Sequence, residues 1–214
     1  MRRRLIRKLA GLARRHSYDG ITLDIEGLDA SVRDPYSDLV RRLDSRLARA
    51  GRGLAVYVPR RTSAPPGATA APYDWAALSA GADLVLASGY NEHYSGGTAG
   101  PITTSAGFGA VLDYAAGIST SRIAPTIGAF GYRWPFGGAP GELVSTREIE
   151  ESPPSFIGTY ADGEVAYLTV GAVSWSETTE GMRMRRQAAA DAGFDWVGLF
   201  SLGRESPGFW PSSC

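Results

Sequence analysis

Gly20-Ile21-Thr22-Leu23-Asp24-Ile25-Glu26 is the stretch that most constrains the fold of this 214-residue chain. Its alternating apolar residues predict a β-strand. Side chains two apart on a strand share a face, so we expect Thr22, Asp24 and Glu26 to point one way. Two carboxylates on one buried face force one of them to keep a proton, which is how a fold makes a general acid. The alternative is a structural role as salt-bridge or helix-cap partners.

Short apolar strands then alternate with helical segments. Four more strands are expected, at residues 54–58, 83–88, 123–129 and 196–202. Helical spacing of apolar residues predicts helices at residues 34–50, 73–78, 108–116 and 182–192. The remainder is expected to comprise a rim loop at residues 63–72 and an insertion at residues 142–179 that contains the turn 160–163. This alternation predicts an α/β fold, with a parallel sheet closed or flanked by helices.

Composition excludes several classes of protein. With 43% hydrophobic and 21% charged residues, the chain is neither disordered, collagenous nor a coiled coil. No apolar run approaches about 18 residues, so no membrane span is expected. The 22 basic and 22 acidic residues cancel, which argues against a nucleic-acid partner for the whole domain. Cys214 is the only cysteine, so an internal disulfide and a cysteine metal site are excluded.

The N-terminus carries a basic amphipathic pattern. Met1-Arg-Arg-Arg4 resembles the start of a secretion signal, but no unbroken apolar segment follows it. Apolar residues recur instead at helical spacing, at Leu5, Ile6, Leu9, Leu12 and Ala13. Such a helix could lie on a membrane or touch nucleic acid. We favour a barrel helix whose apolar stripe packs on a sheet, because a buried-type strand follows at once.

Polar residues also follow the third expected strand, in Ser88-Gly-Tyr-Asn-Glu-His-Tyr94. A tyrosine hydroxyl there can donate a hydrogen bond to a developing charge or a substrate amide. His93 by itself is more typical of a structural histidine. A metal site built from Asp24, Glu26, Glu92 and His93 stays open on counting alone. The sequence has no serine-hydrolase elbow, Walker loop or dinucleotide-binding glycine pattern.

Aromatic residues cluster at or just beyond the expected strand ends, at Tyr90, Tyr94, Phe130, Tyr132, Trp134, Phe136 and Phe200. Flat aromatic faces pack against sugar rings, so the pattern favours a carbohydrate ligand. Phe130 and Phe136 equally suit a hydrophobic core. Trp134, expected on a loop before Pro135, is harder to explain as a core residue.

Together these segments carry a family resemblance. Asp19-Gly-Ile-Thr-Leu-Asp-Ile-Glu26 resembles the Asp-Gly-x-Asp-x-Asp-x-Glu signature of glycoside hydrolase family 18, the chitinase family. Later segments resemble, in order, those of its bacterial branch of spore-cortex and peptidoglycan N-acetylglucosaminidases: 73–78, 88–94, 100–102, 130–134 and 199–210. The likeness covers nearly the whole chain.

The resemblance implies a (β/α)8 TIM barrel and a retaining, substrate-assisted hydrolysis of β-linked N-acetylglucosamine in chitin or peptidoglycan. Glu26 would be the general acid and base, Asp24 would orient the acetamido group, and Tyr90 would donate to its carbonyl. The substrate would be bound by Asn91, Glu92, Tyr132, Trp134 and Phe200. It implies neither a metal nor an organic cofactor, and a secreted or cell-envelope location.

The chain departs from the family pattern in two ways. Thr22, Asn91 and Phe200 replace an inner carboxylate, an aspartate and a tryptophan, so we expect an atypical hydrolase or, alternatively, a catalytically weak carbohydrate-binding protein. Only one helix precedes the Asp24–Glu26 strand, which is the fourth of the family's barrel. Residues 1–214 are therefore expected to form one N-terminally truncated catalytic domain with strands four to eight present and the first three missing.

Overall fold

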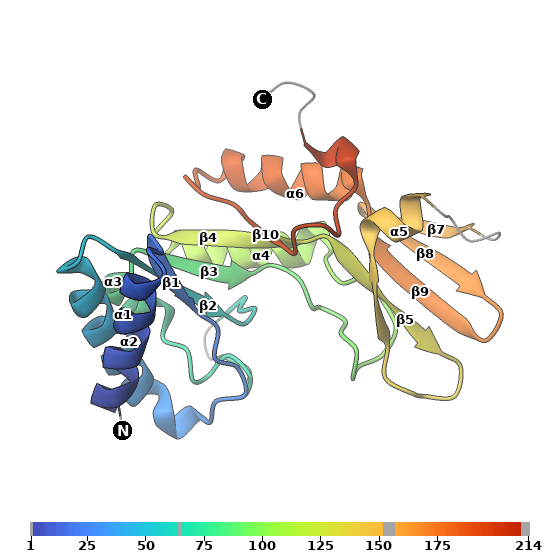
Figure 1. Ribbon diagram of the computed structural model, residues 1–214. Coiled ribbons are helices and arrows are strands. Elements are labelled where there is room, and N and C mark those ends of the chain that lie inside the picture. Colours follow the sequence, from blue (N-terminus) through green and yellow to red (C-terminus); the bar gives the residue numbers. More distant parts are fainter. Residues whose placement is uncertain (1, 64–65, 152–156, 211–214) are drawn as a thin grey trace. The chain divides into compact units, whose positions relative to one another are not determined.

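The computed structural model describes residues 2–63, 66–151 and 157–210 (Figure 1). The single cysteine, Cys214, lies outside this range. The chain divides into two compact units. Unit 1 comprises Met1–Ser88, Asp113–Pro125 and Phe194–Trp196, and unit 2 comprises Gly89–Leu112, Thr126–Gly193 and Val197–Cys214.

A parallel sheet of five strands has the order β1-β2-β3-β4-β10. The strands are β1 (Gly20–Leu23), β2 (Gly53–Val58), β3 (Leu84–Ser88), β4 (Ile123–Gly128) and β10 (Gly198–Phe200). All five match strands expected from the sequence, and the α/β class is confirmed. Parallel neighbours need a crossover between them, and the connecting segments supply helices for it.

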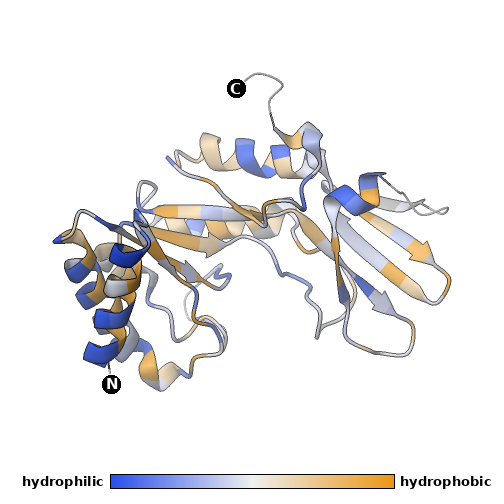
Figure 2. Cartoon of the chain, in the orientation of Figure 1, coloured by the Kyte–Doolittle hydropathy of each residue, from blue (hydrophilic) through white to orange (hydrophobic). Residues whose placement is uncertain are grey.

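Helices α1 (Arg2–Arg15), α2 (Arg33–Ala48) and α3 (Trp75–Gly81) build unit 1 with β1 and β2. On β2, alternate residues Leu54, Val56 and Val58 are fully buried, which is the burial pattern of a strand covered on one face. A 3-10 turn, η1 (Ala30–Val32), precedes α2. Ile6 and Ala13 are the buried residues of α1, whose apolar stripe packs mainly on α2, while its basic residues are exposed (Figure 2). The expectation that this helix packs on a sheet is confirmed only in part, because its main contact is with α2 and its contact with β1 is smaller.

Unit 2 contains an antiparallel sheet that the sequence did not predict. Its order is β6-β5-β9-β8-β7, with β5 (Phe130–Pro135), β6 (Glu142–Ser145), β7 (Ile157–Ala161), β8 (Glu164–Thr169) and β9 (Ala172–Glu177). The helices are α4 (Ser105–Ala116, shared with unit 1), α5 (Thr146–Glu151), α6 (Thr179–Asp191) and the 3-10 turn η2 (Pro207–Phe209). Asp162 and Gly163 join β7 to β8 with φ of 55° and 87°. Positive φ at both positions is typical of an Asp-Gly hairpin turn. The turn expected at residues 160–163 is therefore present, but the strands that it connects were not expected.

Two buried glutamates lie side by side on adjacent strands of that sheet. Glu164 on β8 is the register partner of Glu177 on β9, and both side chains are almost fully buried. Arg185 on α6 is equally buried, with its Nε 4.0 Å from Glu177 Oε2. The Glu164 carboxylate accepts hydrogen bonds from the backbone N–H groups of Ile102 (2.7 Å) and Thr103. Within the described residues, neither carboxylate oxygen of Glu177 has a hydrogen-bond partner.

Burial of these acids favours their neutral forms. It raises the pKa of Glu164 to about 8, against the opposing effect of the two backbone N–H donors. Burial, and then the negative charge of Glu164, raises the pKa of Glu177 well above its ordinary value. Arg185 opposes both increases. One arginine therefore lies beside two carboxyls, and burial favours the protonated form of Glu177.

Glu177→Gln is expected to stabilise the protein at pH 8 relative to the wild type, but not at pH 5. In the wild type, the unfolded chain releases the Glu177 proton above pH 4.5 while the folded chain retains it, so the free energy of unfolding falls as pH rises. Glutamine has no proton to lose, so the difference grows by at most about 1.4 kcal/mol per pH unit. Urea unfolding at both pH values measures it. Exposed Glu180→Gln serves as the control, and an equal pH dependence of Glu177→Gln and wild type would contradict the assignment.

Candidate active site

The acidic residues of the first strand lie on a turn in unit 1. Pairing between β1 and β2 ends at Leu23, opposite Val56, and Asp24 to Glu26 follow outside the strand. The side chains of Asp24 and Glu26 are exposed. The expectation of two carboxylates on one buried face is therefore wrong, because the strand stops before the acids begin. The expected strand over residues 20–26 thus ends three residues early, and both acids lie just beyond its carboxyl end.

A buried tyrosine holds the backbone of residues 24–26 in place, and we call this segment the acidic turn. The Tyr73 hydroxyl donates a 2.7 Å hydrogen bond to the carbonyl of Ile25, the residue between the two acids. Burial raises the pKa of Tyr73, and the negative charges of Glu26 and Asp24 add to the increase. The charges of both acids therefore act on one phenol. Sequence reasoning did not assign Tyr73 a role, although it begins one of the segments that carry the family resemblance.

The ring of Tyr36, on α2, packs against the ring of Tyr73. The two rings meet edge to face, with centroids 5.7 Å apart. Burial, followed by the Tyr73 phenol and Asp24, raises the pKa of Tyr36 strongly. Its hydroxyl is buried and has no hydrogen-bond partner within the described residues. The two tyrosines thus differ in one respect that an experiment can use, since only the Tyr73 hydroxyl bonds the acidic turn.

In unit 2, three of the expected aromatic residues form one cluster. Tyr90 is only 3% exposed, and it stacks on Phe200 with centroids 5.8 Å apart and planes at 27°. Phe130 meets both rings edge to face, at 5.3 Å from Tyr90 and 5.9 Å from Phe200. Phe130 is buried, as its core alternative predicted, whereas the ring of Phe200 at the end of β10 is exposed. An exposed ring resting on buried rings is a surface suited to a sugar face.

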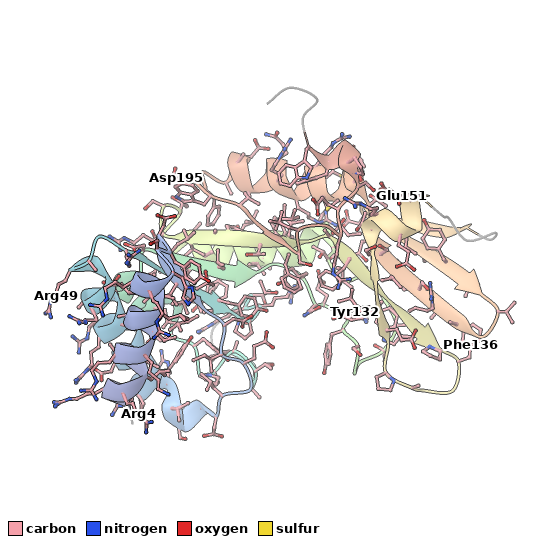
Figure 3. The ribbon with its side chains drawn as sticks, in the orientation of Figure 1. Arg4, Arg49, Tyr132, Phe136, Glu151 and Asp195 are labelled. Carbon is pink, nitrogen blue, oxygen red and sulfur yellow. The ribbon has the colours of Figure 1, made fainter. Side chains whose placement is uncertain are left out.

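Tyr132 and Asn91 extend this aromatic cluster. The Tyr132 hydroxyl donates a long, 3.5 Å hydrogen bond to Asn91 Oδ1, and its ring lies 5.6 Å from that of Phe130 (Figure 3 labels Tyr132). Asn91 has φ of 66°, a left-handed conformation that asparagine tolerates better than most residues. Amide and phenol groups together provide the donors and acceptors that sugar hydroxyls need.

Two aromatic residues lie elsewhere than expected. Trp134 is not on a loop but inside β5, where it is 5% exposed and its ring is 5.5 Å from that of Tyr132. It therefore supports Tyr132 from within the sheet. Phe136 is 59% exposed, so the interpretation of Phe136 as a core residue is wrong (Figure 3). The unpredicted antiparallel sheet explains both errors, because Trp134 is buried within its strand β5, whereas Phe136 lies just beyond the end of that strand.

Glu92 and His93 are engaged with the backbone of unit 2. The Glu92 carboxylate accepts hydrogen bonds from the Thr104 N–H (2.6 Å) and hydroxyl (3.0 Å), immediately before α4. Negative charge at the start of a helix is stabilising. His93 Nδ1 lies 2.9 Å from the Thr98 carbonyl oxygen. Across the described residues, no group of three or more histidine, cysteine, aspartate or glutamate side chains is arranged to hold a metal ion.

Comparison with known proteins gives distant sequence relatives. No protein-family model matches the chain. The uncharacterized glycosylase YvbX of Bacillus subtilis is 24% identical over 221 residues, which cover 98% of this chain and 64% of YvbX. The putative sporulation-specific glycosylase YdhD of the same organism is 26% identical over 146 residues, covering 67% of this chain and 34% of YdhD. The chain thus spans less than two thirds of either relative.

Solved structures share the fold. A chitinase from Chromobacterium violaceum aligns with a TM-score of 0.85 and 23% identity, covering 96% of this chain and 68% of the chitinase. The GH18 chitinase of Cycas revoluta, solved in complex with (GlcNAc)3, aligns with a TM-score of 0.76 and 19% identity, covering 94% and 68% of the two chains. Within the described residues, no helix is both long and apolar enough to cross a membrane.

Proposed function

We propose that this chain, whose fold is that of the chitinase-like glycoside hydrolases of family 18, cleaves β-linked N-acetylglucosamine in chitin or peptidoglycan-type glycans. The observation that carries the proposal is the turn after β1, where Asp24 and Glu26 are exposed on a backbone held by Tyr73. An exposed acid on a fixed backbone can meet a substrate oxygen in a defined geometry. The similarity to two glycosylases of Bacillus subtilis supports the same class of reaction.

In the first step, Glu26 donates its proton to the glycosidic oxygen as the bond from that oxygen to the anomeric carbon breaks. The acetamido oxygen of the same sugar forms a bond to the anomeric carbon, so no carboxylate of the protein acts as nucleophile. The product is a cyclic oxazolinium ion. Asp24 orients the acetamido group and its negative charge stabilises that cation.

In the second step, water attacks the anomeric carbon and gives a proton to the Glu26 carboxylate. The bond to the acetamido oxygen breaks, which restores the acetamido group and the protonated acid. Two inversions at one carbon retain its configuration. The anomer formed first, read by proton NMR during hydrolysis, is therefore expected to be β, and an initial α-anomer would contradict the substrate-assisted route.

Tyr90 and its aromatic neighbours are proposed to bind the sugar. The Tyr90 hydroxyl donates to the acetamido carbonyl, while Phe200 offers a face to the pyranose ring. Tyr132 and Asn91 bond sugar hydroxyls. Trp134 acts through Tyr132, on whose ring it packs. Glu92 has a supporting role in this scheme, since its carboxylate is bonded at the start of α4.

A catalytically weak carbohydrate-binding protein is the second candidate. Thr22, two residues before Asp24, carries no carboxylate that could share the charge of Asp24. Release of 4-nitrophenol from its N,N′-diacetyl-β-chitobioside separates the two candidates. Turnover by the wild type supports the hydrolase, whereas binding of chitooligosaccharides without any release supports the binding protein.

Tyr73→Phe is expected to lower kcat by about 10-fold to 100-fold with little change in KM, because the acidic turn loses its anchor while the sugar-binding groups are untouched. The lost hydrogen bond also lowers the free energy of unfolding by about 1 kcal/mol. Tyr36→Phe is the matched control, since it removes a buried hydroxyl without a hydrogen-bond partner from the adjoining ring. Equal effects of the two variants on kcat would contradict a positioning role for Tyr73.

A further inference from the structure

A groove lined by arginines follows the seam between α1 and α2 in unit 1. The groove consists of three adjoining pockets, which we call hollows. The first and second share Ile6 and Arg42 as lining residues, and the second and third share Arg46 and Arg49. Their linings contain nine arginines and one acidic residue, Asp38. We call this feature the α1–α2 groove. Its cations come from both helices, so the groove is a product of their packing rather than of either helix alone.

Positive charge is concentrated in this part of a neutral chain. Residues 1–52 hold 13 of the 22 basic residues and 7 of the 22 acidic ones. Asp38 forms ion pairs with Arg2, Arg41 and Arg42, at 3.2, 2.7 and 2.8 Å. Five other arginine side chains of the groove have no ion pair or hydrogen bond within the described residues: Arg3, Arg7, Arg14, Arg46 and Arg49. The groove therefore carries a positive charge that the protein itself does not neutralise.

We propose that the α1–α2 groove binds a linear polyanion with phosphodiesters in its backbone, of the polyol phosphate class. The planar fork of the guanidinium group matches phosphate oxygens with two parallel hydrogen bonds. Arg42 and Arg46 on α2 and Arg49 at its C-cap recur about once per helical turn, which gives a row of cations about 5 to 6 Å apart. A flexible chain of phosphates can follow such a row, whereas a single small anion would use only one of its members.

The lining of the groove argues against two other polyanionic partners. Single-stranded nucleic acid is bound largely by stacking its bases on aromatic side chains. Among the described residues, no aromatic side chain lines the three hollows. An amphipathic helix binds a membrane surface through apolar side chains that lie beside its cations. The exposed leucines of α1, Leu5 and Leu12, line none of the hollows, and helical geometry puts them on the opposite flank of α1 from Arg7 and Arg14.

The test compares two triple variants of the 214-residue chain. Arg14→Gln/Arg46→Gln/Arg49→Gln removes three charges from the groove. Arg4→Gln/Lys8→Gln/Arg15→Gln removes three charges from the flank of α1 that lines none of the hollows. Arg49, at the C-cap of α2, and Arg4, on α1, are labelled in Figure 3 and are both exposed. Binding is measured by fluorescence anisotropy with labelled synthetic poly(glycerol phosphate) over a series of salt concentrations, after thermal unfolding shows that both variants are folded.

The groove variant is expected to bind on the order of 50-fold more weakly at about 0.15 M salt, with the slope of log K against log salt reduced by about 2, because three released counterions are lost. The flank variant should retain affinity within a few-fold. No binding by the wild type, or equal losses in the two variants, would overturn the proposal. Equally tight binding of oligo(dT) or of phosphatidylglycerol vesicles would replace the polyol phosphate with a nucleic acid or a membrane.

This inference does not rest on the proposed glycosidase activity. The groove variant is expected to hydrolyse a soluble chitobioside at the wild-type rate, since none of its three positions belongs to the acidic turn or the aromatic cluster. The two proposals can therefore fail separately. Loss of polymer binding with unchanged hydrolysis assigns the groove its own role.

Discussion

Glu26→Gln is expected to lower kcat on 4-nitrophenyl N,N′-diacetyl-β-chitobioside by about 100-fold to 10,000-fold, which is the range that a positioned general acid contributes. Glutamine has nearly the shape of glutamate but carries no transferable proton, so neither protonation of the leaving oxygen nor activation of water remains. KM should change little, because the groups proposed to hold the sugar are elsewhere. Initial rates of nitrophenol release at several substrate concentrations measure both constants.

The matched control is Glu142→Gln, the same chemical change at an exposed glutamate on β6. Wild-type kinetics are expected for this variant. Full activity of Glu26→Gln would remove Glu26 from the mechanism. Isothermal titration of chitooligosaccharide into Glu26→Gln completes the experiment, since the substrate should still bind when it is no longer cleaved.

Arg185→Met is expected to lower the free energy of unfolding by about 3 to 5 kcal/mol at neutral pH. The buried guanidinium donates to the Ser105 hydroxyl (2.7 Å), to the Thr103 carbonyl (2.9 Å) and to the Asp162 carbonyl. Methionine fills similar space but leaves these acceptors without their donor. It also removes the buried cation that lies beside Glu164 and Glu177 and opposes the rise of their pKa values.

Arg183→Met on the same helix separates this effect from a loss of helix stability. Arg183 is exposed, its ion pair with Glu180 is long, at 3.7 Å, and its one hydrogen bond in the described residues goes to the Gly208 carbonyl, so its replacement should cost at most about 1 kcal/mol. Urea unfolding with comparison of midpoints and m-values measures both variants. Similar small losses in the two would mean that the cluster of Arg185 with the buried glutamates contributes little to the stability of unit 2.

Much of the parallel sheet could be predicted because its signal is local. Each strand is a short apolar run bounded by polar or turn residues, and each helix has apolar residues at a spacing of three or four. The five expected strands and their helices follow from these patterns. The antiparallel sheet was missed because strands such as Glu164–Thr169 mix charged, aromatic and small residues, and they acquire their burial only by pairing.

The candidate site divides in the same way. Asp24 and Glu26 could be located from the order of residues, since they stand at the end of the expected apolar strand over residues 20–26. The exposure of these two side chains could not be predicted from the sequence, because it depends on where β1 stops pairing with β2. Tyr73 lies 48 positions after Ile25, so no local pattern connects its hydroxyl to the acidic turn. The burial of Trp134 likewise depends on β6 and β9, which flank β5 in the antiparallel sheet.

The order of amino acids by itself determined the α/β class, the succession of parallel strands and the chemical groups available after the first of them. These properties follow from periodicity and from residue type, which act over a few neighbouring positions. Tertiary structure decided which groups are exposed, which are paired and which cations line the α1–α2 groove. Residues far apart in the chain make those contacts, and burial and charge take effect only once the contacts exist.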